Sequence, residues 1–122
     1  MIPTDLQATT TSGPGGRWTV RVGGELDLAT AEHLAKLLDS VIRSAGAIEI
    51  IIDLEKLRFM DASGIRVLVV SHQLAQRLGR TLRACNAHGE VDTILRLVGV
   101  AELVHLPETS SAGSVNFETG YE

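Results

Sequence analysis

Cysteine and aromatic residues are scarce in this sequence of 122 residues. Cys85 is the only cysteine, and aromatic residues make up 3% of the chain. A single cysteine cannot form an internal disulfide, which suits a reducing cytoplasm. So few aromatic side chains cannot build a platform on which nucleic-acid bases stack.

Long apolar runs and a targeting signal are also lacking. The uncharged apolar runs extend over only a handful of residues, whereas a membrane-spanning helix needs roughly 20. No basic segment followed by an apolar one stands at the amino terminus, as a secretory signal would require. We therefore expect a cytoplasmic protein that does not enter a membrane.

Basic charge is neither abundant nor concentrated. The formal net charge is −4, and the nine arginines and two lysines are scattered along the chain. Phosphate contacts to nucleic acid need a concentrated basic surface, so we expect no direct binding of nucleic acid.

Ligands for metals and cofactors are sparse as well. Cys85 and His88 form a single pair, whereas a structural zinc ion takes four ligands. Neither common glycine-rich phosphate-binding motif is present. The sequence therefore predicts no metal site and no cofactor.

The residues that are present predict one domain with a buried core. Hydrophobic residues make up 44% of the chain and are spread evenly. We place this single domain at residues 1–107. From Glu108 onward Thr, Ser, Gly and acidic residues dominate, and we expect a flexible tail over residues 108–122.

Two segments of alternating polarity predict a β-hairpin at the edge of a sheet. Residues 4–10 alternate weakly and residues 17–22 alternate cleanly, with the turn sequence SGPGG between them. The apolar run at 47–54 is typical of a central strand covered on both faces. Residues 81–85 predict a further strand, and residues 102–106 a short last strand or a turn before Pro107.

Three segments between and after these strands have helical spacing. Residues 30–44 form the first, with Thr30 or Asp27 available as N-cap and Gly46 where the helix should stop. Residues 64–78 form the second, and residues 91–98 the third. Strands and helices thus alternate after the hairpin, which predicts an α/β fold with a mixed sheet, parallel in its later part.

The stretch FMDASGIRVLVV, residues 59–70, places a serine between an acidic turn and an apolar helix. Serine is among the best N-cap residues, so we expect Ser63 to cap the second helix. Gly64 beside it allows tight packing, and Asp61 favours the positive end of the helix. A structural role is therefore one interpretation of this turn.

The same turn also suits a phosphorylated serine. We expect a phosphate on Ser63 to meet free N–H groups and a favourable helix dipole. Asp61 is two residues away, and Asp27 could lie on the same edge of the sheet. One phosphorylation could therefore switch off the binding of a partner without unfolding the protein.

The helix after this turn carries more apolar surface than one contact needs. A stripe facing the sheet accounts for five residues, Ile65, Leu68, Val69, His72 and Ala75. Val67 and Val70 lie outside it. Either a neighbouring helix covers these two valines, or they belong to a surface on which a partner docks.

Two segments together resemble a known family. GGELDLATAEHL at 23–34 and IIIDLEKLRFMDASGIRVL at 50–68 are similar to the STAS domain of bacterial anti-sigma factor antagonists, and the similarity runs from about residue 17 to residue 106. The resemblance implies a mixed four- to five-stranded sheet with an N-terminal hairpin and three or more packed helices.

The resemblance also implies a partner-switching role. The unphosphorylated antagonist binds an anti-sigma factor, often a serine-protein kinase, and so frees a sigma factor. The kinase then phosphorylates the serine that maps to Ser63, and a serine phosphatase resets the switch. Asp27 and Asp61 match acidic positions near that serine. The resemblance leaves open whether the chain forms a homodimer.

Three departures from the family pattern stand out. Ala62 replaces a common serine or threonine, which leaves Ser63 as the one hydroxyl of the turn. Arg66 replaces a common glycine and could pair with a phosphate or alter the preference of the kinase. The carboxyl-terminal sequence shows no final helix. The partner-binding residues we predict are Asp27, Asp61, Ala62, Ser63, Gly64, Arg66, Val67 and Val70.

Several other functions are weaker interpretations. A nucleophilic Ser63 would need a nearby base, and His72 lies roughly 13 Å further along the helix at about 1.5 Å per residue. Asp53 at the end of a strand could be the phospho-aspartate of a receiver domain, but the sequence lacks the acidic pair and the lysine of such domains. Asp53 is better explained as a residue that satisfies loop N–H groups. We therefore expect no enzyme. A STAS scaffold, sensor or nucleotide-binding module whose partner is not a kinase remains the alternative.

Overall fold

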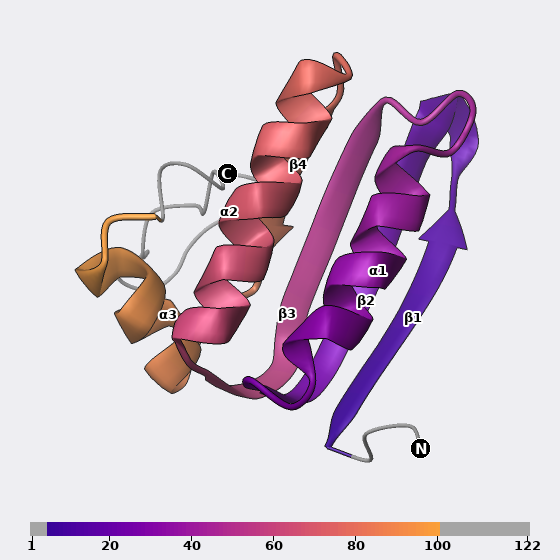
Figure 1. Cartoon of the computed structure of the whole chain (residues 1–122). Coiled ribbons are helices and arrows are strands. Elements are labelled where there is room, and N and C mark those ends of the chain that lie inside the picture. Colours follow the sequence, from indigo (N-terminus) through magenta and orange to yellow (C-terminus); the bar gives the residue numbers. More distant parts are fainter. Residues whose placement is uncertain (1–4, 101–122) are drawn as a thin grey trace.

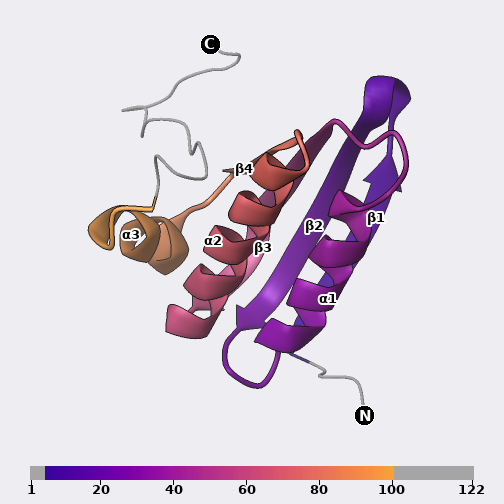
Figure 2. The same ribbon diagram turned by 45° about the horizontal axis from the view of Figure 1, so that its top comes forward.

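A four-stranded sheet with two long helices side by side on one face forms the frame of the molecule (Figures 1 and 2). The computed structural model describes residues 5–100. The strand or turn expected at 102–106 and the tail expected at 108–122 lie outside them. The elements are β1 Leu6–Ser12, β2 Arg17–Leu26, α1 Ala31–Ile42, β3 Glu49–Met60, α2 Ala62–Arg77, β4 Thr81–Cys85 and α3 Gly89–Leu97, with a short 3-10 turn at Pro14–Gly16.

The strand order is the chain order, β1-β2-β3-β4. β1 and β2 form the antiparallel hairpin, and β3 and β4 each run parallel to the strand before. Each parallel step uses one crossover helix, α1 and then α2. This confirms the predicted α/β fold with a mixed sheet that is parallel in its later part.

The helix boundaries differ from the predicted ones by a few residues. α1 begins one residue later than expected and ends at Ile42, whereas α2 begins two residues earlier, at Ala62. Gly79 follows α2 with a φ of 75°, a left-handed conformation that glycine adopts without a steric penalty. The predicted helix stop at Gly79 is therefore confirmed.

The expectation that β3 is covered on both faces is wrong. Ile50, Ile52 and Leu54 are fully buried under the helices, but Glu49, Ile51 and Asp53 point to the other face and are only partly buried. The reason lies in the crossovers, because α1 and α2 both pack on the same face. β3 is apolar enough for a buried strand, yet Glu49 and Asp53 place charges on the face that the helices do not cover.

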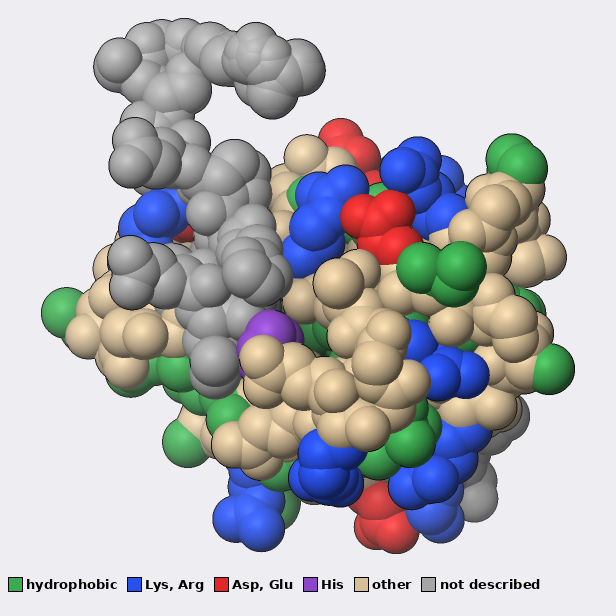
Figure 3. Space-filling model, turned by 90° about the horizontal axis from the view of Figure 1, so that it is seen from above, with side chains coloured by type: hydrophobic (Ala, Val, Ile, Leu, Met, Phe, Trp, Pro, Cys, Tyr) green, Lys and Arg blue, Asp and Glu red, His purple; other side chains and the backbone are tan. Residues whose placement is uncertain are grey.

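Ion pairs connect three strands across the other face of the sheet. The carboxylate of Glu49 accepts hydrogen bonds from the Nε atoms of Arg17 at 2.9 Å and Arg83 at 3.0 Å. Burial raises the pKa of Glu49, but the bonds and charges of these arginines outweigh burial and hold the pKa below its usual 4.5. Figure 3 looks onto the end of the sheet where these strands begin and shows basic side chains on both sides of acidic ones.

α3 lies beside the second half of β3, at the lower left of Figure 1. β4 pairs only with Glu49–Asp53, so the remainder of β3 has no strand on that side within the described chain. Val91 and Leu95 of α3 are buried against the core there. None of the helices between residues 5 and 100 is long and apolar enough to cross a membrane.

Candidate functional site

The ends of β2 and β3 bring the predicted site residues to one edge of the sheet. Leu26 and Met60 form the last pair of these parallel strands, and the backbone N–H of Asp61 donates to the carbonyl oxygen of Leu26 at 3.2 Å. The chain then enters α1 after β2 and α2 after β3. The segments that hold Asp27 and Ser63 therefore begin next to each other, at the lower end of the sheet in Figure 1.

Asp61, and not Ser63, is the N-cap of α2. The carboxylate of Asp61 accepts a hydrogen bond from the backbone N–H of Ser63 at 2.8 Å. Ser63 is the second residue of the helix, so its predicted capping role is wrong. Asp61, two residues earlier, has a carboxylate acceptor in reach of the first-turn N–H groups. The helix therefore begins after Asp61, which takes the N-cap position.

The first-turn N–H groups after Ala62 are already used. Besides the Ser63 N–H, the N–H groups of Gly64 and Ile65 donate to the carbonyl oxygen of Asp61 at 3.0 and 3.1 Å. The expectation that a phosphate on Ser63 would meet free N–H groups is therefore wrong for these three. Asp61 supplies both acceptors.

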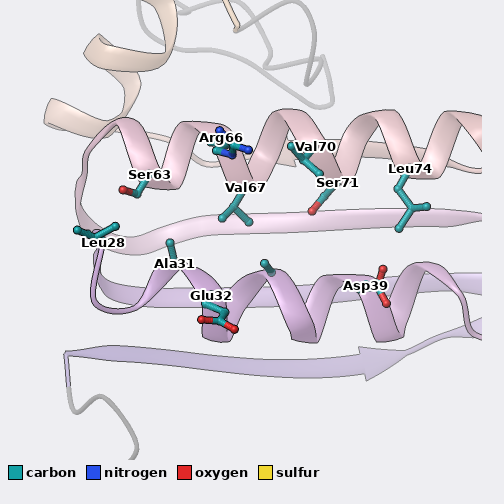
Figure 4. Close-up of a pocket in the computed structure, with 11 residues that line it drawn as sticks. Leu28, Ala31, Glu32, Asp39, Ser63, Arg66, Val67, Val70, Ser71 and Leu74 are labelled. Carbon is teal, nitrogen blue, oxygen red and sulfur yellow. The ribbon is translucent and has the colours of Figure 1, made fainter.

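The hydroxyl of Ser63 makes no hydrogen bond to any residue in the described range 5–100. The residue is half-buried, and Figure 4 shows its hydroxyl at the start of α2, at one end of the groove between α1 and α2. Since Asp61 does the capping, this hydroxyl has no structural task in the described part of the chain. The Ser63 hydroxyl is therefore free to be modified without loss of a hydrogen bond to residues 5–100.

Asp27 has a similar task at the start of α1. Its carboxylate accepts from the N–H groups of Ala29 at 3.0 Å and Thr30 at 3.2 Å. In return the N–H of Asp27 donates to the hydroxyl of Thr30 at 3.0 Å. Of the two predicted capping residues, Thr30 is the N-cap of α1 but makes no capping bond with its side chain, and Asp27 supplies the carboxylate acceptor in the turn just before it. Both carboxylates at this edge are fixed by backbone N–H groups.

Gly64 allows α2 to approach the sheet closely. A Cβ atom at this position would lie 2.8 Å from Cγ and Cδ2 of Leu26 and 2.8 Å from Cγ of Met60. Leu26 and Met60 are buried and belong to the last pair of β2 and β3. The tight packing expected at Gly64 is therefore present.

A groove of about 490 Å³ runs between α1 and α2, with Ser63 at one end (Figure 4). Its floor and rim are mostly apolar, and its lining residues are Leu28, Ala31, Glu32, Ala35, Asp39, Ser63, Arg66, Val67, Val70, Ser71 and Leu74. We call this the α1–α2 groove. An apolar groove with a few polar groups is suited to receive an apolar side chain of a partner.

The two valines outside the sheet-facing stripe have different environments. Val67 is 8% exposed, because α1 packs beside it, whereas Val70 is 51% exposed. The neighbouring helix thus covers Val67, and only Val70 offers substantial surface. Within the stripe, Leu68, His72 and Ala75 are buried, whereas Ile65 and Val69 are half-buried.

Leu28 belongs to the groove, although it was not among the predicted site residues. Its side chain is 82% exposed, next to Asp27 in the turn before α1. The signal in the sequence is a leucine inside a capping turn, where no helical or strand period requires an apolar residue. Such an exposed side chain beside an apolar groove enlarges the surface available to a partner.

The other polar candidates have structural roles. Asp53 accepts from the N–H of Glu55 at 3.0 Å and from the amide of Asn86 at 3.0 Å, as expected for a residue that satisfies loop groups. Burial raises the pKa of the Cys85 thiol to about 11, and the negative charge of Asp53 makes a smaller contribution in the same direction. Among residues 5–100 no three His, Cys, Asp or Glu side chains come together in a group that could hold a metal ion.

Comparison with known proteins shows which family shares this fold. The STAS domain matches residues 6–112. A curated relative, the anti-sigma F factor antagonist of Paenibacillus polymyxa, is 28% identical over 85 residues, which are 70% of this chain and 73% of the relative.

Solved structures share the fold. An anti-sigma factor antagonist from Mycobacterium paratuberculosis aligns over 92% of this chain and 94% of its own, with 20% identity and a TM-score of 0.76. The antagonist SpoIIAA in its unphosphorylated form aligns over 90% of this chain and all of its own (100%), with 22% identity and a TM-score of 0.69. The match to the STAS domain covers most of the sequence, and this protein belongs to the STAS domain family.

Proposed function

We propose that this protein is an anti-sigma factor antagonist, which binds an anti-sigma factor and thereby releases a sigma factor. Phosphorylation of Ser63 switches the binding off. The observation that carries this proposal is the hydroxyl of Ser63, which has no hydrogen bond within residues 5–100 and lies at the end of the α1–α2 groove. The names of the curated relatives and of the structural neighbours support the same function.

The binding surface combines the turn before α2 with the groove. It consists of the residues predicted from the sequence except Gly64, which is buried against the sheet, and its exposed apolar contacts are Val70 and Leu28. Val67 contributes as part of the groove wall and not as an exposed contact. An apolar side chain of the partner would enter the groove while polar groups of the partner meet the turn.

Electrostatics explains why a phosphate would act as a switch. A phosphoserine adds about −1.5 to −2 charges. Asp61 and Asp27 hold negative charge at the same edge of the sheet, and their hydrogen bonds keep them in place. A negative charge about 4 Å from a negatively charged group of the partner costs on the order of 1 to 4 kcal/mol near a surface. Each 1.4 kcal/mol corresponds to roughly tenfold in affinity.

The partner is an anti-sigma factor that is itself a serine-protein kinase, and the chain is its substrate and not an enzyme. The Ser63 hydroxyl attacks the terminal phosphorus of a nucleoside triphosphate held by the kinase. The bond from that phosphorus to the nucleoside diphosphate breaks, and the hydroxyl proton passes to a base of the kinase. A serine phosphatase hydrolyses the phosphoserine and resets the switch. We place these reactions in the cytoplasm.

The test compares the binding of an ATP-dependent anti-sigma kinase by variants at two serines. We expect Ser63→Glu to bind the kinase at least about tenfold more weakly than the native chain, because the added charge lies in the interface. Ser63→Ala should bind like the native chain. Ser12→Glu, at the far end of β1, adds the same charge away from the surface and is the control.

Isothermal titration calorimetry measures the dissociation constants, and circular dichroism verifies that each variant is folded. An unchanged constant for Ser63→Glu would contradict the switch. Transfer of phosphate from ATP to Ser63→Ala at the native rate would contradict the assignment of the modified residue.

A further inference from the structure

We propose that Arg66 holds the phosphate of phosphorylated Ser63 through an ion pair within α2. This inference rests on the proposed phosphorylation of Ser63 and adds a residue that positions the product. Ser63 and Arg66 both line the α1–α2 groove and are three residues apart on one helix (Figure 4). Side chains at this spacing are neighbours, with about 5–6 Å between their Cβ atoms.

The charges around the groove leave Arg66 available. Glu32 pairs with Lys36 at 3.4 Å, and Asp39 pairs with Arg43 at 3.1 Å. Arg66 is exposed and takes part in no ion pair or hydrogen bond with another residue of the range 5–100. It is therefore a cation near Ser63 that is not paired with another side chain of the range 5–100.

Three N–H groups of the first turn are not free for this task. The N–H groups of Ser63, Gly64 and Ile65 already donate to the side chain and the carbonyl oxygen of Asp61. A phosphate that used these donors would have to displace the cap of α2. The guanidinium of Arg66 can instead approach by a change of side-chain rotamer, and its paired N–H donors match two phosphate oxygens.

The ion pair would also offset the repulsion from the fixed carboxylates. Asp61 and Asp27 both place negative charge at this edge, and neither can turn away without breaking its hydrogen bonds to backbone N–H groups. Without a nearby cation, an added dianion would be disfavoured there. With Arg66 the phosphate is held on α2, where it blocks the groove entrance in a defined position.

The experiment installs phosphoserine at position 63 by genetic-code expansion, so that no kinase is needed. Phosphorus NMR then follows the phosphate from pH 4 to 8 in the native background and in Arg66→Gln. We expect the second pKa of the phosphate to be lower by about 0.5 in the native background, because the cation favours the dianion. Arg77→Gln, which removes an exposed arginine from the other end of α2, should leave this pKa at the native value.

A second signal reports directly on the guanidinium. The Nε–H resonance of Arg66, identified by its loss in Arg66→Gln, should shift in the phosphorylated protein and return as salt is added. Equal phosphate pKa values in the native background and in Arg66→Gln would overturn the proposal. Since the phosphate is introduced without the kinase, this result is separate from a failure of the kinase to modify Ser63.

Discussion

Asp61 and Ser63 lie two residues apart and perform different tasks. We expect Asp61→Ala to lower the free energy of unfolding by about 1 kcal/mol, because it removes the acceptor that binds the Ser63 N–H at 2.8 Å. Ser63→Ala should change it by less than about 0.5 kcal/mol, because its hydroxyl makes no hydrogen bond within residues 5–100. Urea unfolding measures both values.

Asp61→Asn is the matched control for this pair. It retains a side-chain oxygen that can cap α2 and removes only the charge, so most of the stability should remain. A loss for Ser63→Ala as large as that for Asp61→Ala would show that the serine, and not the aspartate, caps the helix.

Gly64 is a second position where a single added atom, the Cβ of alanine, should change the free energy of unfolding. The Cβ of Gly64→Ala would lie 2.8 Å from Leu26 and Met60, which are both buried. Overpacking of a core costs about 1–3 kcal/mol, whereas alanine gains up to about 1 kcal/mol over glycine in a helix. We therefore expect a net loss of about 1 kcal/mol in urea unfolding.

Gly13→Ala tests whether this loss is specific. A Cβ at Gly13 would lie 3.7 Å from the carbonyl oxygen of Arg17, an ordinary contact, and the φ of −123° suits alanine. This variant should be neutral to within about 0.5 kcal/mol. An equal loss for both variants would contradict the close approach of α2 to the sheet.

At the scale of the elements, the ion pairs between β2, β3 and β4 make stability depend on pH. The pKa of Glu49 is below 4.5 in the folded protein, so its contribution is fully present above about pH 5. That contribution is lost as the pH falls through the folded pKa. We expect Glu49→Gln to lose less stability than the native chain between pH 5 and pH 3.

Chemical unfolding at several pH values measures this difference. Glu32→Gln is the control, because Glu32 is also paired but is exposed on α1, with a side-chain exposure of 81%. Its pH profile should follow that of the native chain. Identical profiles for Glu49→Gln and the native chain would refute the role of the ion pairs.

The periods in the sequence predicted the strands and helices between residues 5 and 100, but not every boundary or every face. β3 runs from Glu49 to Met60, well beyond the end of the predicted strand at 47–54. The alternation at 17–22 and the helical spacing at 64–78 report which residues share a face, and these elements are present. The covering of β3 depends on the side to which α1 and α2 cross over, which local periodicity does not contain. Val67 and Val70 are alike in sequence, and only the packing of α1 separates them.

For the whole molecule, we expect the folded unit to end before the last residues. Residues 108–122 contain few apolar side chains, and removing them should change the free energy of unfolding by less than about 0.5 kcal/mol. A chain that ends at residue 112, where the match to the STAS domain ends, is the control. A clear loss of stability on truncation to 1–107 would place part of the folded unit beyond Pro107.

The shared edge of the site also followed from the topology, because parallel strands end at the same edge of a sheet. Asp27, Asp61 and Ser63 could therefore be expected near one another. What the sequence could not reveal is which of two good capping residues takes the cap. That depends on the backbone path after Met60, where the carbonyl of Leu26 binds the N–H of Asp61.

The cap on Asp61 has a consequence for any enzyme that modifies Ser63. Its carboxylate fixes the Ser63 main chain in a helical turn, which cannot be drawn out as an extended substrate without uncapping α2. A modifying enzyme must therefore accept a folded surface. A synthetic peptide of residues 59–70 would be a poor mimic, since so short a helix is marginal in water on its own.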